Sequence, residues 1–135
     1  MAADLTRILY ADDEEDILNV ASMALEMLGG FSVTTCGNGF DAIAEARRNP
    51  PDLIMLDVMM PGMDGPETLS RIRADALLSE VPVLLMTARV RDVEMDDYLA
   101  RGADGVISKP FDPMTLADEV RRVWKQAMVK RNQMA

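Results

Sequence analysis

Residues 53–65 read Leu-Ile-Met-Leu-Asp-Val-Met-Met-Pro-Gly-Met-Asp-Gly: an apolar run, then one carboxylate, then a turn. A continuous apolar run is typical of a strand that is buried on both faces of a parallel sheet. Asp57 ends this run, and the Pro-Gly and Asp-Gly pairs that follow it indicate a loop. Because ligand sites of open α/β sheets lie at the carboxyl ends of the strands, Asp57 is either a functional carboxylate or a turn-forming aspartate.

Strand-like and helix-like segments alternate along the whole chain. Short apolar runs predict strands at Arg7–Ala11, Ser32–Cys36, Leu53–Leu56, Val83–Met86 and Gly105–Ile107. Helical spacing predicts helices at Glu14–Leu28, Phe40–Arg48, Pro66–Arg73, Asp92–Arg101 and Pro113–Val129. Five such units predict a doubly wound α/β fold, in which parallel strands are joined by right-handed helical crossovers and helices cover both faces of the sheet.

The first and last predicted helices show the clearest apolar faces. These faces are Ile17, Ala21, Leu25 and Leu28 in the first helix, and Leu116, Val120, Val123 and Ala127 in the last. Gly29-Gly30 and Gly102 fit C-terminal caps, and Asp112 before Pro113 fits the start of the last helix. We expect residues 130–135 to fray, and we predict a single domain over residues 1–135 with its core at about 6–129.

Composition and charge exclude several classes of function. The net charge of −9 argues against binding to nucleic acid phosphates or to anionic lipid, since both need a basic surface. The chain has no histidine, which excludes Ser-His and Cys-His catalysis, histidine metal ligands and a phosphohistidine on this chain. Most of the 12 methionines are interpreted as core packing.

Cys36 is the only cysteine, so the chain cannot form an intramolecular disulfide. This fits a reducing compartment, and the sequence shows neither a signal peptide nor an apolar stretch long enough to span a membrane. We therefore expect a cytoplasmic protein.

Polar residues end four of the predicted strands, and in a parallel sheet all these ends lie at one edge. They are Asp12 and Asp13 after the first strand, Asp57 after the third, Thr87 and Ala88 after the fourth, and Ser108, Lys109 and Pro110 after the fifth. Three neighbouring carboxylates repel one another, and a bound cation would relieve that repulsion. A set of oxygen ligands without Cys or His favours a hard ion, Mg²⁺ first, with Mn²⁺ or Ca²⁺ as alternatives.

These residues suit phosphoryl transfer to a carboxylate. Asp57 would attack phosphorus, while a divalent ion, Lys109 and the Thr87 hydroxyl neutralise the phosphoryl oxygens. The product would be an aspartyl phosphate, a labile mixed anhydride that suits a timed signal.

At these positions the chain resembles the receiver domain of two-component response regulators, over about residues 6 to 129. The resemblance is carried by five motifs in order: Asp12-Asp13, Asp57, the loop Met60-Pro61-Gly62-Met63-Asp64-Gly65, Thr87-Ala88, and Lys109-Pro110-Phe111. It implies a flavodoxin-like (βα)5 fold with strand order 2-1-3-4-5.

The resemblance also implies a role for each site residue. Asp57 is then the phosphoacceptor. Asp13 and Asp57 would ligate Mg²⁺ directly, together with the backbone carbonyl of Met59, and Asp12 would act mostly through water. Thr87, the N–H of Ala88 and Lys109 would contact the phosphoryl group. The family also implies a cis bond between Lys109 and Pro110.

Phosphorylation in this family changes the face formed by the fourth helix, fifth strand and fifth helix, as Thr87 moves toward the phosphoryl group. The switch position on the fifth strand is commonly aromatic in the family, but here it is Val106, which has no ring to swing inward. Neither Met59 nor Arg89, which flank the site, is an obvious base. We therefore expect slow autodephosphorylation and no enzymatic turnover.

The leading interpretation is a stand-alone receiver that switches protein–protein interactions. Its donor would be a histidine kinase or a histidine phosphotransfer protein, its output a downstream protein effector, and its own state a monomer or weak homodimer. One alternative is a receiver that forms part of a larger regulator or hybrid kinase. The others are a pseudo-receiver that ignores phosphorylation and a Mg²⁺-dependent phosphatase.

The fourth helix carries acidic residues on its outer side, while its Met95 and Leu99 are expected to pack inward. The fifth helix carries Arg121, Arg122 and Lys125. Solvated helix faces explain both sets of charges, and an output face that matches both signs is the alternative.

Overall fold

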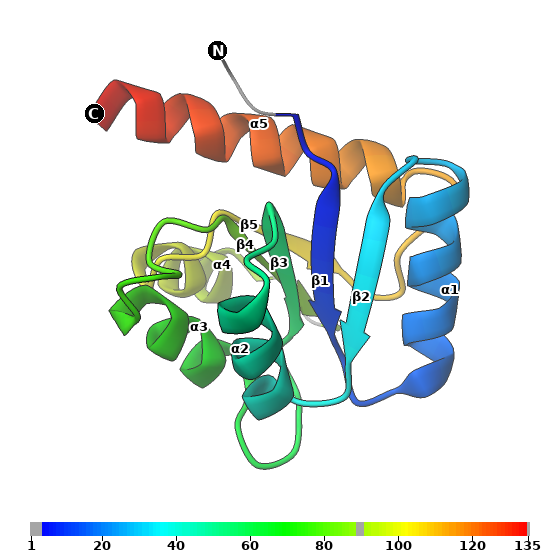
Figure 1. Ribbon diagram of the computed structural model, residues 1–135, viewed down its shortest axis with the longest axis horizontal. Helices are drawn as coiled ribbons and strands as arrows, with labels where there is room; N and C mark the ends of the chain where they lie inside the picture. Colours follow the sequence, from blue (N-terminus) through cyan, green and yellow to red (C-terminus); the bar gives the residue numbers. More distant parts are fainter. Residues whose placement is uncertain (1–3, 89–90, 135) are drawn as a thin grey trace.

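The structure is a computed structural model and describes residues 4–88 and 91–134. Five strands form a single parallel sheet in the order β2-β1-β3-β4-β5, as Figure 1 shows for β1 between β2 and β3. Their bounds are Arg7–Ala11 (β1), Ser32–Cys36 (β2), Leu53–Asp57 (β3), Val83–Thr87 (β4) and Gly105–Ser108 (β5). This is the flavodoxin-like α/β fold that the sequence predicts.

The helices alternate with the strands along the chain. Their bounds are Glu15–Met27 (α1), Gly39–Arg48 (α2), Gly65–Ala74 (α3), Asp92–Ala100 (α4) and Leu116–Met134 (α5). Side-chain caps begin two of them: Asn38 accepts from the N–H of Asp41 at 2.8 Å, and Asp64 accepts from the N–H of Glu67 at 2.8 Å. Gly30 (φ 72°) and Gly102 (φ 112°) end helices in the left-handed region, as predicted for C-terminal caps.

The sheet separates two hydrophobic cores, because successive residues of a strand point to opposite faces. On one face, α1 and α5 pack against alternate strand residues that include Ile8, Tyr10 and Met55. On the other face, α2 and α3 pack against Leu9, Ile54 and their neighbours. Figure 1 shows α1 beside β2 and the long helix α5 crossing the sheet toward the C-terminus. All residues of β3 and β4 are buried, as their continuous apolar runs predict.

Two predicted apolar faces are only partly correct. In α1, Ala21 and Leu25 are buried, but Leu28 is 52% exposed because the helix ends at Met27, and Leu18 is buried instead. In α4 no residue is buried, and Leu99, which was expected to pack inward, is 43% exposed.

The methionines divide between core and surface. Among the methionines whose burial the structure describes, Met55, Met60, Met63 and Met86 are buried, and Met23, Met27, Met59 and Met114 are exposed. Packing therefore explains only part of the methionine content.

The last helix differs from its prediction at both ends. Asp112 begins a turn in which its side chain accepts from the N–H of Met114 at 2.9 Å, and regular helix starts only at Leu116. The helix was predicted to end at Val129, but residues 130–134 continue α5. Arg131 explains the extension, because its guanidinium donates to the carbonyl of Glu80 and to the Asp104 carboxylate, each at 2.8 Å.

None of the helices in the described part of the chain combines the length and the apolar character that a membrane crossing needs.

Candidate functional site

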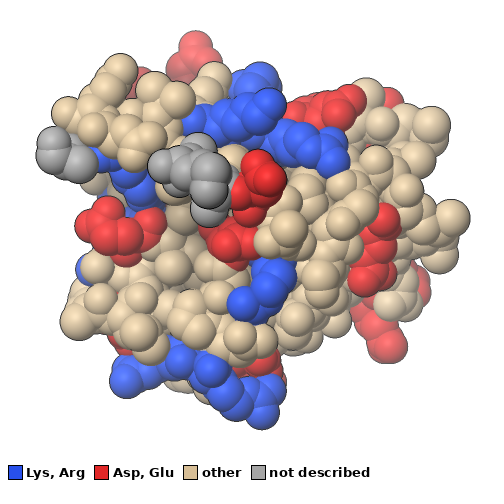
Figure 2. Space-filling view, turned by 45° about the horizontal axis from the view of Figure 1, so that its top comes forward, with Lys and Arg blue, Asp and Glu red and all other residues tan. Residues whose placement is uncertain are grey.

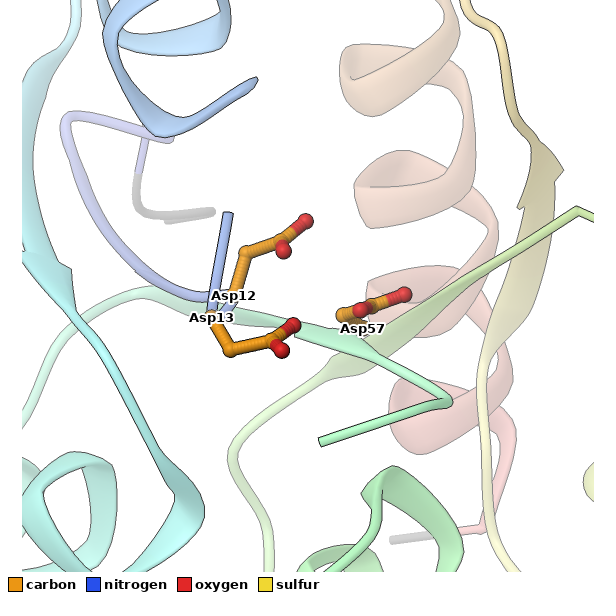
Figure 3. Close-up of side chains that lie close together, drawn as sticks. All are labelled: Asp12, Asp13 and Asp57. Atoms are coloured by element: carbon orange, nitrogen blue, oxygen red, sulfur yellow. The ribbon is translucent and has the colours of Figure 1, made fainter. Parts of the chain in front are cut away.

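Strand order and register bring the predicted carboxylates together. The central strand β3 lies between β1 and β4, with Leu56 opposite Ala11 and Asp57 opposite Met86. Asp57 at the end of β3 therefore lies beside Asp12 and Asp13, which directly follow β1. One carboxylate oxygen from each of these three residues lies within 4.8 Å of the other two. Figure 3 shows Asp12 and Asp13 reaching from the end of β1 toward Asp57.

Asp12 is fully buried and accepts three hydrogen bonds. Its Oδ1 accepts from the N–H of Glu14 at 2.9 Å. Its Oδ2 accepts from the Tyr10 hydroxyl at 2.9 Å and from Lys109 Nζ at 3.0 Å. Asp13 is exposed, so the acidic pair offers one fixed, buried carboxylate and one that faces solvent.

Lys109 links the two buried carboxylates, as its position across from Asp57 predicts. Its Nζ lies 3.0 Å from Asp12 Oδ2 and 3.2 Å from Asp57 Oδ1. The Lys109-Pro110 bond is cis, and the Lys109 N–H donates to the Thr87 carbonyl at 2.8 Å. Burial alone would lower the pKa of Lys109, but its hydrogen bond to Asp12 and the charge of Asp57 raise the pKa above its usual value, so the ammonium stays charged.

The environment of Asp57 opposes its ionisation. The residue is only 4% exposed. Burial and then the neighbouring charge of Asp12 raise the pKa of Asp57 to about 6, although Lys109 acts in the opposite direction. Added positive charge would favour the ionised form, which is the nucleophilic form of a carboxylate.

The donor set fits a hard divalent cation. Asp12, Asp13 and Asp57 offer oxygen ligands only, and Lys109 is the one ammonium that contacts Asp12 and Asp57 among the described residues, so three carboxylates share one positive charge. Mg²⁺ prefers carboxylate oxygens and retains several of its waters, so it does not need an all-protein cage.

The remaining predicted residues surround this cluster. Thr87 ends β4, is buried and lies opposite Ser108 of β5, and Ala88 after it is exposed. Met59 follows Asp57 by two residues and its side chain is 76% exposed. Val106 is half-buried on β5, opposite Leu85. Arg89 lies outside the described residues.

Sequence pattern did not identify Tyr10 as a residue that contacts the site. Tyr10 was interpreted only as part of the first strand, yet its hydroxyl bonds Asp12. Residues two apart on a strand share a face, so the pair Tyr10 and Asp12 was the signal that could have revealed it. Burial and the charge of Asp12 raise the pKa of Tyr10 far above its usual value, so the hydroxyl remains a proton donor.

The chain is similar to known proteins along nearly its whole length. Residues 8–121 match the family described as the response regulator receiver domain. The chain is 36% identical over 124 residues to the transcriptional regulatory protein CseB of Streptomyces coelicolor. It is 34% identical over 123 residues to the alkaline phosphatase synthesis transcriptional regulatory protein PhoP of Bacillus subtilis. These alignments cover 92% and 91% of this chain but 51% and 50% of the relatives, so the chain spans about half the length of the curated relatives it matches.

The chain also resembles solved structures of receiver proteins. The chemotaxis protein CheY4 of Vibrio cholerae matches with a TM-score of 0.82 and 32% identity, over 89% of this chain and 99% of that chain. The signal receiver domain of a signal transduction histidine kinase from Syntrophus aciditrophicus matches with a TM-score of 0.77 and 30% identity, over 89% of this chain and 90% of that chain.

Proposed function

This chain belongs to the response regulator receiver domain family, and from that premise we propose that Asp57 accepts a phosphoryl group in a Mg²⁺-dependent reaction. One observation carries the proposal. Asp57 is a buried carboxylate whose oxygen lies 3.2 Å from the Lys109 ammonium and within 4.8 Å of oxygens of Asp12 and Asp13. That arrangement combines a nucleophile, a fixed positive charge and a set of metal ligands.

Each side chain of the site, at the carboxyl ends of the strands, has a role in the phosphoryl transfer. An Asp57 carboxylate oxygen forms a bond to phosphorus while the bond from phosphorus to the donor's leaving group breaks, and its electron pair leaves with that group. Lys109 offsets charge on the phosphoryl oxygens, and Thr87 with the N–H of Ala88 supplies further hydrogen bonds to them. Asp13, Asp57 and the Met59 carbonyl would hold Mg²⁺, with Asp12 acting through water, and the ion would supply neutralising charge for the phosphoryl oxygens.

The donor and the output lie outside this domain. Because the chain has no histidine, the phosphoryl group comes from a histidine kinase or a histidine phosphotransfer protein. We place this exchange in the cytoplasm, where the single thiol of Cys36 stays reduced. Phosphorylation then shifts the population toward a state in which Thr87 moves toward the phosphoryl group and β5 around Val106 adjusts, which changes protein–protein contacts.

The test is chemical phosphorylation followed by intact mass. Purified protein is incubated with Mg²⁺ and acetyl phosphate, beside Asp57→Asn and the control Asp41→Asn, which alters an exposed carboxylate at the start of α2. We expect wild type and Asp41→Asn to gain one phosphoryl group and Asp57→Asn to gain none. Absence of any gain in wild type, with Mg²⁺ or Mn²⁺ and also with a phosphorylated histidine donor, would contradict the proposal and favour a phosphorylation-independent interaction module.

The phosphoryl group should leave slowly, because Met59 beside Asp57 has an exposed thioether that cannot act as a base for water. The measurement is the decay of the phosphorylated mass after removal of the donor. Complete loss within seconds would contradict this expectation.

A further inference from the structure

The hydroxyl of Tyr10 reaches the acidic cluster from the buried core of the protein. Tyr10 lies in the middle of β1, is fully buried in the core between the sheet and helices α1 and α5, and shares its strand face with Asp12. Its hydroxyl donates to Asp12 Oδ2 at 2.9 Å. Packing alone does not require that hydroxyl, since a phenylalanine ring would fill nearly the same volume.

The hydroxyl shares its acceptor with Lys109. Lys109 Nζ also donates to Asp12 Oδ2, at 3.0 Å, and it reaches Asp57 Oδ1 at 3.2 Å. Without Tyr10, Lys109 would be the remaining described donor to that oxygen and would be drawn toward Asp12. With Tyr10 present, Asp12 keeps a partner on Oδ2 when Lys109 turns toward charge developing at Asp57.

A tyrosine hydroxyl suits this position because it is neutral. Two positive charges near one carboxylate repel each other, so a second cation beside Asp12 would oppose binding of a metal ion. A neutral donor fixes the direction of the carboxylate without adding that repulsion. Partners that orient direct metal ligands are worth roughly 10- to 100-fold in metal affinity, and the lower end of that range is expected here because Asp12 would contact the ion through water.

We propose that Tyr10 is a positioning residue that orients Asp12 toward the bound cation and leaves Lys109 available to Asp57. This inference rests on the proposed function, because it concerns the same Mg²⁺-dependent site. By this inference Tyr10, a residue of the apolar core, contributes to Mg²⁺ affinity together with the carboxylates of the site.

The test compares Tyr10→Phe with Tyr98→Phe, which removes the hydroxyl of the chain's other tyrosine, on α4. Mg²⁺ binding is measured by titration calorimetry on the full chain, and folding is checked by circular dichroism. We expect the Mg²⁺ Kd to rise about tenfold in Tyr10→Phe and to stay within about twofold of wild type in Tyr98→Phe. Phosphorylation by acetyl phosphate should slow by about tenfold at limiting Mg²⁺ and recover at saturating Mg²⁺.

A folded Tyr10→Phe protein that binds Mg²⁺ as tightly as wild type would overturn the inference and leave Tyr10 as a packing residue. Wild-type protein that binds no Mg²⁺ would instead contradict the proposed function and with it this inference, so the two failures are distinguishable.

A second measurement does not depend on the folding of the variant. Wild-type protein is labelled with ¹³C at Cζ of tyrosine, which gives two resonances, and Tyr98→Phe assigns the one from Tyr10. We expect this resonance to move on addition of Mg²⁺ with the Kd found by calorimetry. A Tyr10 resonance that stays unchanged at saturating Mg²⁺ would overturn the inference.

Discussion

Carboxylates lie at both ends of the parallel strands, partly or fully buried, but their charge is balanced differently at the two ends, called here the carboxyl edge and the amino edge. At the carboxyl edge, Asp12, Asp13 and Asp57 gather around Lys109. At the amino edge, Asp104 lies between two arginines, with Arg73 at 3.0 Å and Arg131 at 2.8 Å. Asp104 Oδ2 also accepts from the N–H of Val83 at 2.9 Å.

The difference separates an edge organised for stability from one organised for function. The amino edge satisfies its carboxylate fully and uses it to join α3, β4 and α5. Figure 2, which turns the top of Figure 1 forward, shows acidic and basic side chains interspersed over that side of the molecule. At the carboxyl edge three carboxylates share one lysine, so net negative charge remains there for a metal ion to neutralise.

The largest expected effect concerns the amino edge. Asp104→Ala leaves Arg73 and Arg131 without their shared carboxylate. Removal of one partner from a fully buried ion pair costs about 3–5 kcal/mol, and we expect the lower end, about 3 kcal/mol, because both arginines are partly exposed. We expect that loss in the free energy of unfolding, measured by urea denaturation, while folded Asp104→Ala protein is still phosphorylated at Asp57. A loss below about 1 kcal/mol would show that the amino edge is not the stabilising one.

Asp57→Asn should raise the free energy of unfolding, in contrast to Asp104→Ala, which should lower it. The pKa of Asp57 is raised from 3.8 to about 6, so the folded state binds more protons than the unfolded state between these pH values. The stabilising contribution of the protonated Asp57 carboxyl is therefore present below about pH 4 and is lost as the pH rises through 6. Without Mg²⁺, Asp57→Asn should be more stable than wild type by about 2–3 kcal/mol at pH 7 and no more stable near pH 4.

Urea denaturation of both proteins across this pH range measures the difference. If Asp57→Asn is less stable than wild type at pH 7, or if the difference in stability between them does not vary with pH, the carboxyl edge does not lower the stability of the protein as we expect.

Mg²⁺ should narrow that difference in stability between wild type and Asp57→Asn. Binding to the folded state alone stabilises wild type by about 1.4 kcal/mol at a concentration ten times the Kd. Asp57→Asn, which lacks one of the ligands, should gain much less. Thermal unfolding with and without Mg²⁺, with Ca²⁺-free buffer and a chelator control, gives the comparison. Equal stabilisation of both proteins would place the ion elsewhere.

The smallest effect is expected for an ion pair outside both edges. Arg101 and Asp97 lie 3.3 Å apart on the exposed side of α4. Exposed pairs at this spacing contribute about 0.3–0.5 kcal/mol. Arg101→Gln should therefore change the free energy of unfolding by about that amount or less, and a larger change would indicate that charges are coupled far from the buried clusters.

Local sequence pattern predicts most of the fold and the site, and its errors have physical causes. The strands at Arg7–Ala11 and Ser32–Cys36 match residue for residue. The other three were predicted one residue short, because an apolar criterion stops before Asp57, Thr87 and Ser108 although the backbone pairing continues. Strand-end spacing also predicted the acidic cluster and its contact with Lys109.

Long-range contacts account for what the sequence pattern missed. Helical periodicity along α5 cannot reveal that Arg131 reaches Glu80 and Asp104, and these contacts extend the helix beyond its predicted end. The hydroxyl of Tyr10 was overlooked because an apolar strand was interpreted only as packing. Burial of α4 was overestimated, since its mixed sequence provides no apolar face that the sheet covers.

The most direct test of the central claim is to locate the phosphoryl group on the chain. Protein phosphorylated with acetyl phosphate and Mg²⁺ is treated with borohydride, which reduces an aspartyl phosphate to homoserine, and is then digested and sequenced by tandem mass spectrometry. We predict homoserine at position 57 and unmodified aspartate at positions 12, 13 and 104. Homoserine at another aspartate, or none in protein whose mass shows a phosphoryl group, would contradict the assignment of Asp57 as the phosphoacceptor.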